Sequence, residues 1–454
     1  MTSSTSRREF LRRGSALAAA GVASPWALNL AAMSAASAQS VTDDYRALVC
    51  VFLYGGNDNH NTVVPLDDAN HAAYARIRTG ITLTQAELAP NELLPANAWP
   101  DARRMALHPA MAPLKTLFDS GSLVLAMNVG TLAGPTTLAD YNAGIGLPPK
   151  LFSHNDQQSV WQAGVSEGAL TGWGGRIADL MLQGNGAAGM FTSISAAGNA
   201  VFMSGKNVVQ YQVSPAGSIE VGRVFGSDAA TAATKRVMQQ PSAHLFDEGH
   251  ATIARRSISA DLQVRAALAG VPDIVFPADN PLAAQLKIVA RLIAARASLG
   301  AKRQVFFVSL GGFDMHDDLI AQHPVQLGLV ANAMKAFYDA TVTLGVADRV
   351  TAFTGSDFGR TLSSNGDGSD HGWGSYHVVM GGAVNGKRWV GQLPVVAVSG
   401  PNDVGSGRLL PAIAVDQYGA TLAKWLGVQP GQMADVFPNI GRFSSADLGF
   451  MKAA

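Results

Sequence analysis

Continuous apolar runs, separated by long helical segments, constrain the fold of this chain more than any other feature. Residues 46–54 (RALVCVFLY) are apolar almost without a break, and 304–310 (QVFFVSL) and 349–355 (RVTAFTG) are similar. Such runs indicate strands that are buried on both faces, as in a parallel sheet. We expect further strands at 122–129, 374–382 and 393–399.

Helical segments of ten residues or more lie between these strands. We expect helices over 109–119, 154–164, 246–269, 281–299, 318–344 and 416–426. The alternation predicts an α/β fold, in which a doubly wound, mostly parallel sheet is sandwiched by helices. In such a sheet, ligands bind beyond the carboxyl ends of the strands.

The first 38 residues predict a twin-arginine signal peptide. Residues 6–11 (SRREFL) match the twin-arginine pattern, and 36–38 (ASA) offer a cleavage site. The alternatives are an ordinary secretory signal or a membrane anchor, but Pro25 and Asn29 interrupt an apolar region too weak to span a bilayer. We therefore expect a periplasmic or secreted protein, with the twin-arginine translocase as partner during export and no stable membrane span.

The rest of the chain, 39–454, is expected to form one domain with a small strand-containing insertion at about 185–275. Lysine and arginine together number 33, and aspartate and glutamate also number 33. The neutral balance and the lack of a basic tract exclude nucleic acid as a partner. The single Cys50 lies inside an apolar run and excludes an intrachain disulfide.

Acidic and histidine side chains follow several of the expected strands. Carboxylates and imidazoles at strand ends are what a two-metal hydrolytic site of the Zn, Mn or Mg type requires. Any single Asp–His pair is also typical of a solvated loop, and the earliest aspartate also suits a turn or helix cap. The candidate metal ligands are Asp58, Asp314, His316, Asp357, Asp370, His371 and His377.

Three further residues suit the chemistry of an ester. Ser153 precedes a helix, where free backbone N–H groups and the helix dipole favour an anion, so it is the candidate nucleophile. It could instead simply cap that helix. His154 could bind substrate or orient the site, and Arg360 could bind an oxyanion or form a structural ion pair.

Motifs spread over nearly the whole mature chain carry a resemblance to a known family. They include LYGGNDNHNTVVP, SHNDQQSVWQAG, GGFDMH, SDFGRT, NGDGSDHGWG and VDQYGATLAKWLG. With these the chain resembles the DUF1501 family of exported bacterial proteins, within the alkaline phosphatase/sulfatase-like superfamily. The resemblance implies an alkaline-phosphatase-like sheet sandwiched by helices and a pair of divalent metals.

By motif position, the resemblance implies one metal held by Asp58, Ser153, Asp370 and His371. It implies a second metal held by Asp314, His316 and His377. Asp357 stands where relatives more often have Glu, so both direct coordination and an outer role stay open. Formylglycine sulfatases need a C/S-x-P-x-R context, which neither Cys50 nor Ser153 has.

These observations predict an exported metal-dependent hydrolase of phosphate or related esters, acting on a small-molecule or polymer ester. Ser153 would attack, with one or two divalent metal ions as cofactors. The alternative from another class is a non-catalytic binding or assembly protein of the cell envelope that keeps the fold. A metal-using mutase is a third possibility, although export argues against phosphosugar substrates.

Overall fold

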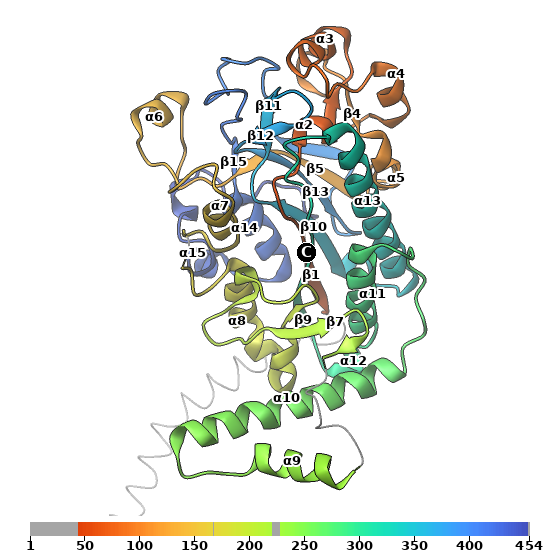
Figure 1. Ribbon diagram of the computed structural model, residues 1–454, viewed down its shortest axis with the longest axis vertical. Coiled ribbons are helices and arrows are strands. Elements are labelled where there is room, and N and C mark those ends of the chain that lie inside the picture. Colours follow the sequence, from red (N-terminus) through yellow and green to blue (C-terminus); the bar gives the residue numbers. More distant parts are fainter. Residues whose placement is uncertain (1–43, 167, 220–227, 453–454) are drawn as a thin grey trace, which may run out of the picture. The chain divides into compact units, whose positions relative to one another are not determined.

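A mixed, mostly parallel sheet forms the centre of residues 46–454 (Figure 1). The computed structural model describes residues 44–166, 168–219 and 228–452, so the predicted signal peptide lies outside the described residues. The strand order is β14-β5-β13-β10-β1-β9-β6-β7-β8, and β15 pairs with β5. These strands are β1 Arg46–Leu53, β5 Leu123–Gly130, β6 Ser193–Ser195, β7 Tyr211–Ser214, β8 Gly217–Ser218, β9 Arg303–Leu310, β10 Val350–Ser356, β13 Ser375–Met380, β14 Arg388–Gly391 and β15 Ile413–Ala414.

Parallel pairing dominates the middle of this sheet. β1 lies between β10 and β9 and runs parallel to both, and β9–β6, β6–β7, β14–β5 and β15–β5 are also parallel. β13 runs antiparallel to β10 and β5, and β8 runs antiparallel to β7. The predicted fold class is therefore confirmed, with one antiparallel strand, β13, in the interior of the sheet.

Helices cover both faces of the sheet, as Figure 1 shows for α8 and α14 on one side and α11 and α13 on the other. The longer helices are α3 Asp68–Ile77, α5 Ala112–Asp119, α7 His154–Ala163, α8 Trp173–Asn185, α9 Ala229–Gln239, α10 Leu245–Ala269, α11 Pro281–Ala294, α13 Leu319–Thr343 and α14 Val415–Leu426. The shorter α-helices are α2 Asn59–Thr62, α4 Gln85–Leu88, α6 Leu138–Ala143, α12 Arg296–Leu299 and α15 Met433–Val436.

Short 3₁₀ helices and two small sheets complete the described elements. The 3₁₀ helices are η1 Ala89–Asn91, η2 Pro100–Ala102, η3 Pro109–Met111, η4 Gly186–Phe191, η5 Val201–Met203, η6 Ala347–Arg349, η7 Pro430–Gln432 and η8 Ile440–Arg442. One small sheet contains β2 Val63–Pro65, β3 Glu92–Leu93 and β4 Met105–Leu107, and the other is the hairpin β11 Arg360–Ser364 with β12 Ser369–His371.

The apolar run of β1 is buried on both faces, which is why it lacks the alternation of a half-exposed strand. Leu48, Cys50 and Phe52 pack in one core cluster with Trp173 of α8 and Tyr418 of α14. Cys50 is fully buried within it. None of the helices in the described ranges has the length and apolar character needed to span a membrane.

Two strands differ from the sequence-based expectation. The strand expected at 393–399 is wrong: this segment is a loop, in which the Pro394 carbonyl accepts from Arg103 and the Val395 amide donates to Asn402. Within 185–275, the expected insertion, β6 and β7 continue the central sheet beyond β9. The short strand β14 was missed because it has only four residues, none of them buried.

Candidate metal centre

The carboxyl ends of β1, β9 and β10 lie side by side at one edge of the sheet. Leu53, the last residue of β1, is in register with Leu310 of β9 and with Ser356 of β10. The loops that follow them therefore meet. Gly55, with φ of 112°, lies so close to the β9 loop that an added Cβ would sit 2.4 Å from the backbone nitrogen of Asp314. Only glycine permits this approach.

Two other segments reach the same edge. The hairpin β11–β12 pairs Arg360 with His371 and so presents both side chains together. The start of α7 contributes His154, the first residue after its N-cap Ser153. Phe152, just before the cap, has φ of 71°, a conformation that a bulky residue rarely adopts. Its carbonyl oxygen accepts a hydrogen bond from Nδ1 of His371 at 2.8 Å.

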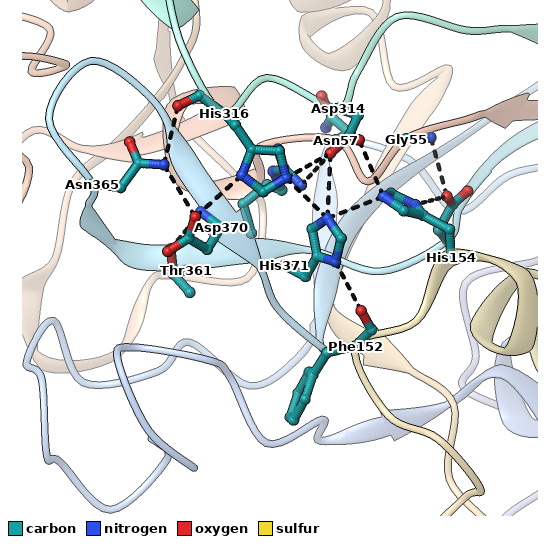
Figure 2. Close-up of polar contacts among 12 residues, drawn as sticks. Gly55, Asn57, Phe152, His154, Asp314, His316, Thr361, Asn365, Asp370 and His371 are labelled. Atoms are coloured by element: carbon teal, nitrogen blue, oxygen red, sulfur yellow. Dashed lines mark hydrogen bonds and ion pairs between the residues drawn. The ribbon is translucent and has the colours of Figure 1, made fainter.

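Three imidazoles and one carboxylate converge at this edge, as Figure 2 shows. Nε2 of His371 lies 3.1 Å from Nε2 of His154 and 3.0 Å from Nε2 of His316. Asp314 places Oδ2 3.3 Å from Nε2 of His154, and Oδ1 3.1 Å from Nε2 of His316 and 3.4 Å from Nε2 of His371. Ligand atoms of His154, Asp314 and His371 all lie within 4.8 Å of one another. We refer to His154, Asp314, His316 and His371 as the His/Asp cluster.

The second nitrogen of each imidazole in the cluster is held by an oxygen acceptor. Nδ1 of His154 lies 2.7 Å from Oδ2 of Asp357, and Nδ1 of His316 lies 3.1 Å from Oδ1 of Asp370. Nδ1 of His371 faces the Phe152 carbonyl. Because carbonyl and carboxylate oxygens only accept, each Nδ1 carries a proton, and in the neutral ring each Nε2 then presents a lone pair. Metal-binding histidines are held in this way.

Asp357 lies directly behind His154. Its Oδ2 also accepts from the backbone amide of Gly55 at 3.1 Å and from Nε2 of Gln158 at 2.8 Å. The hydrogen bond between Nδ1 of His154 and Asp357 is the main cause of the raised pKa of His154. Burial, and then the neighbouring charge of His154, lower the pKa of His371. The pKa values of His154 and His371 are therefore shifted in opposite directions, although the two rings are neighbours.

Arg360 supplies a buried positive charge beside the cluster. Its Nη1 donates to Oδ1 of Asp314 at 2.9 Å, and its Nε and Nη2 have no hydrogen-bond partner among the described residues. Burial lowers the pKa of Arg360, although the charge of Asp314 opposes the shift. Partial burial raises the pKa of Asp314, but the charges of Arg360 and His154 outweigh it, so that this pKa lies below its usual value.

Asp58 does not join the cluster, and its role as a metal ligand stays a prediction from the motif. Its Oδ2 forms a buried ion pair with Nη2 of Arg78, and its Oδ1 accepts from the backbone amide of His60. Arg78 also donates through Nη1 to the carbonyl of Thr361 at 3.0 Å. The carboxylate thus caps α2 and neutralises a buried guanidinium, so both of its oxygens have partners.

His377 also lies apart from the cluster. It is buried on β13, with its ring stacked on Tyr418 at 5.9 Å and edge-on to Trp161 at 6.2 Å. Burial lowers the pKa of His377 to about 3. Because β13 is antiparallel, it begins at the edge that holds the site and carries His377 into the core. His377 therefore lies outside the cluster, and its role as a metal ligand also stays a prediction from the motif.

The hydroxyl of Ser153 points to a carboxylate and not to the cluster. Oγ donates to Oδ2 of Asp156 at 2.9 Å, and Oδ1 of Asp156 lies 3.4 Å from Nζ of Lys150. Ser153 therefore occupies the N-cap position of α7 without using its side chain to cap the backbone. It makes no hydrogen bond to the His/Asp cluster within the described part of the chain.

The sequence matches the family model described as "Protein of unknown function (DUF1501)" over residues 45–429. The chain belongs to the DUF1501 family. No curated protein matches the sequence.

Solved structures resemble this DUF1501 protein only distantly. The lipoteichoic acid synthase LtaP from Listeria monocytogenes is 7% identical with a TM-score of 0.33, and the likeness covers 86% of this chain and 73% of that one. The PsFucS1 sulfatase from Pseudoalteromonas sp. is 9% identical with a TM-score of 0.36, covering 93% and 76%. TM-scores this low establish nothing about activity.

Four residues around the cluster escaped the sequence analysis: Phe152, Gln158, Asp156 and Asn365. Phe152 acts through a backbone carbonyl whose direction depends on its positive φ. No residue type signals that conformation here. Asn365 donates to Oδ1 of Asp370 and to the backbone carbonyl of His316. Its position in NGDGSDH resembles that of an ordinary turn residue, so only the folded chain reveals these contacts.

Proposed function

We propose that this protein is a metal-dependent hydrolase of phosphate or related esters. The observation that carries the proposal is the His/Asp cluster, in which each Nδ1 is held by an acceptor and each Nε2 is directed inward. Imidazole Nε2 atoms that lie only 3.0 to 3.1 Å apart repel one another through their lone pairs unless a proton or a cation lies between them. A divalent cation satisfies all of them at once.

The donor set fits a metal of the Zn type, since nitrogen and carboxylate ligands suit Zn and, with more carboxylate, Mn. His154, His316, His371 and Asp314 would hold the ion. Asp357 and Asp370 would act as hydrogen-bond acceptors that orient two of the rings. The ion pair between Asp58 and Arg78 removes a carboxylate that a second ion would need, so we propose one ion rather than two.

When bound, a divalent ion would stabilise negative charge on the ester oxygens and on the leaving oxygen. Arg360 would bind the ester's anionic oxygens, because its Nε and Nη2 are buried donors without partners. Buried, unsatisfied donors are costly, and an anion in this place would satisfy them. This charge is the reason that we favour phosphate and related esters over neutral ones.

Ser153 is the proposed nucleophile, and Asp156 is the proposed acceptor of its proton. A hydroxyl 2.9 Å from a buried carboxylate, which is itself paired with Lys150, is the arrangement of a nucleophile, its base and a third group that orients the base. The start of α7 adds free backbone amides that favour an attacked anion. Proton transfer from Ser153 to Asp156 would free Oγ to attack the ester phosphorus, forming an Oγ–P bond as the bond to the leaving alcohol oxygen breaks. Asp156 would return the proton to that alcohol, and water would then hydrolyse the Oγ–P bond to release phosphate.

The substrate is proposed to be large or carried on a polymer. Side chains of the cluster are open to solvent, with exposed fractions of 46% for Asp314, 45% for His316 and 25% for His371. An open site can accept an ester on a long chain. Export by the twin-arginine translocase to the periplasm or beyond, proposed from residues 6–11, would bring the protein to such material.

The test is metal content and turnover of the processed protein, with two matched variants. His371→Gln removes a proposed ligand, whereas His250→Gln makes the same change at an exposed position of α10. We expect stoichiometric Zn or Mn in the parent and in His250→Gln, and none in His371→Gln. Hydrolysis of phosphomonoesters, phosphodiesters or sulfate esters should follow the metal. Folded parent protein that takes up no metal would overturn the proposal, and metal without hydrolysis of any ester would favour a binding or assembly role.

A further inference from the structure

The tip of the β11–β12 hairpin forms backbone hydrogen bonds with the loop that carries Asp314 and His316. The backbone amide of Leu319 donates to the carbonyl of Asp367 at 2.9 Å, and the amide of Ser369 donates to the carbonyl of Met315 at 3.2 Å. These bonds join a segment after β9 to a segment more than 45 residues later in the chain. The geometry of the cluster therefore depends on how this tip is held.

Glycine allows the tip to come this close. A Cβ added to Gly368 would lie 2.2 Å from the carbonyl carbon of His316, and Gly366 has φ of 135°. Any larger residue at 368 would push the backbone of His316 away. The tip thus lies directly against the residue whose ring must face His371.

Asn365 connects this tip to two members of the site. Its Nδ2 lies 3.0 Å from the carbonyl oxygen of His316 and 3.0 Å from Oδ1 of Asp370. Its Oδ1 accepts from the amide of Gly368 at 3.1 Å. Oδ1 of Asp370 also accepts from Nδ1 of His316 (Figure 2). One amide therefore holds both the backbone of His316 and the carboxylate that orients its ring.

Asp370 needs such support because its side chain is half exposed, with an exposed fraction of 50%. A half-exposed carboxylate is free to turn toward water unless a donor fixes it, and ordering its side chain costs entropy. Thr361 holds only the backbone amide of Asp370, through Oγ1 at 3.0 Å. In the described part of the chain, the Asp370 carboxylate accepts hydrogen bonds from His316 and from Asn365. Asn365 is therefore the donor that can fix the carboxylate independently of the His316 ring.

We propose that Asn365 is a positioning residue of the metal centre, which fixes Asp370 and the backbone of His316 so that Nε2 of His316 faces His371 and Asp314. The proposal rests on the proposed function in one respect, namely that the His/Asp cluster binds a divalent ion. It assigns Asn365 no contact with substrate or metal. Its effect is on metal affinity.

The experiment measures the dissociation constant for Zn²⁺ of the full processed protein, by competition with a chromophoric chelator. Asn365→Ala should weaken Zn²⁺ binding by about 10-fold to 100-fold, as removal of an outer hydrogen-bond partner does at other metal sites. Ser364→Ala is the matched control, because Ser364 bonds through Oγ only to Gly366 within the same turn. That variant should bind Zn²⁺ within about twofold of the parent.

A double-variant cycle separates a positioning role from a general loosening of the turn. In an Asp370→Ala background, Asn365→Ala should weaken Zn²⁺ binding much less than it does in the parent, since its principal target is gone. Asn365→Gln, which moves the amide by one methylene, should fall between the parent and Asn365→Ala. Because Asn365 is exposed, these variants should unfold at the parent's denaturant concentration when free of metal.

The outcomes separate the two proposals. Parent-like Zn²⁺ affinity in Asn365→Ala, or an equal loss in Ser364→Ala, would overturn the role of Asn365 and leave the metal centre standing. An undiminished effect of Asn365→Ala in the Asp370→Ala background would also overturn it. Failure of the parent to bind Zn²⁺ or any other divalent ion would instead overturn the proposed function.

Discussion

Replacing Asp58 by Asn tests whether this residue is a metal ligand or half of a structural ion pair. Motif position implies a ligand, whereas the fold pairs the carboxylate with Arg78. The two roles predict opposite results. A ligand's loss should abolish metal binding, whereas the loss of an ion-pair partner should cost stability and leave the metal centre intact.

The magnitude follows from the surroundings of the pair. The side chains of Arg78 and Asp58 are 0% and 2% exposed, so loss of the carboxylate leaves a buried guanidinium without a counter-charge. Breaking a buried pair in this way costs about 3–5 kcal/mol. The variant side chain keeps an oxygen that can accept from the amide of His60, so the cap of α2 survives. We therefore expect Asp58→Asn to lower the free energy of unfolding by about 3–5 kcal/mol.

The assay is urea unfolding followed by tryptophan fluorescence, since Trp161 and Trp173 lie in the core beside β10. Midpoints and slopes are compared between variants, and metal content is measured on the same samples. The double variant Asp58→Asn/Arg78→Met is the control. It should recover part of the lost stability, because no unpaired charge stays buried.

Two results would refute the reasoning. One is an Asp58→Asn protein with the parent's unfolding midpoint, since the buried ion pair would then contribute nothing. The other is loss of the metal with little loss of stability, which would return Asp58 to the ligand set implied by the family motif.

Three further predictions concern pH, the anion site and the core histidine. Burial raises the pKa of Asp416 from 3.8 to about 6, so its proton stabilises the fold at low pH and this stability is lost as pH rises from about 4 through 6. Two pKa units correspond to about 3 kcal/mol. In urea unfolding, the free energy of unfolding of Asp416→Asn should therefore rise by up to that amount relative to the parent between pH 4 and pH 7. A difference between the two proteins that does not change with pH would contradict this. Arg360→Lys should weaken the inhibition of ester hydrolysis by inorganic phosphate by about 10-fold or more, because lysine cannot replace the Nε and Nη2 donors. The variant should keep its metal. Arg388→Lys, at an exposed position, is the control, and equal phosphate inhibition in both variants would refute the anion site. His377→Phe should keep the parent's metal content, since His377 packs on Tyr418 in the core, and loss of metal in this variant would restore it as a ligand.

The main strands and helices were predictable because local pattern dictates them. β1, β9 and β10 are apolar runs buried on both faces, and α10, α13 and α14 lie within a few residues of their expected bounds. The segment at 393–399 misled because an apolar composition is not sufficient for a strand. Its first half contains Pro394, which lacks an N–H, and side chains from elsewhere bond its backbone groups.

Part of the candidate site was also predictable, for a reason that lies in parallel sheets themselves. Carboxyl ends of neighbouring parallel strands meet at one edge, so residues that follow β9 and β10 had to come together whatever their partners. Asp314, His316 and Asp357 illustrate this, and all three lie at or beside the cluster.

The sequence by itself determined a mostly parallel α/β sheet, the edge at which acidic and histidine side chains gather, and the family. The tertiary structure alone decided which of those side chains turn toward one another. Asp58 pairs with Arg78, 20 residues later in the chain. His377 lies in the core because β13 runs antiparallel to its neighbours. His371 is held by a carbonyl 219 residues earlier, and Asn365 by contacts across the β9 loop. Such choices depend on which groups lack a partner after folding, since a buried polar atom is stable only when another group satisfies it, and no local pattern encodes that.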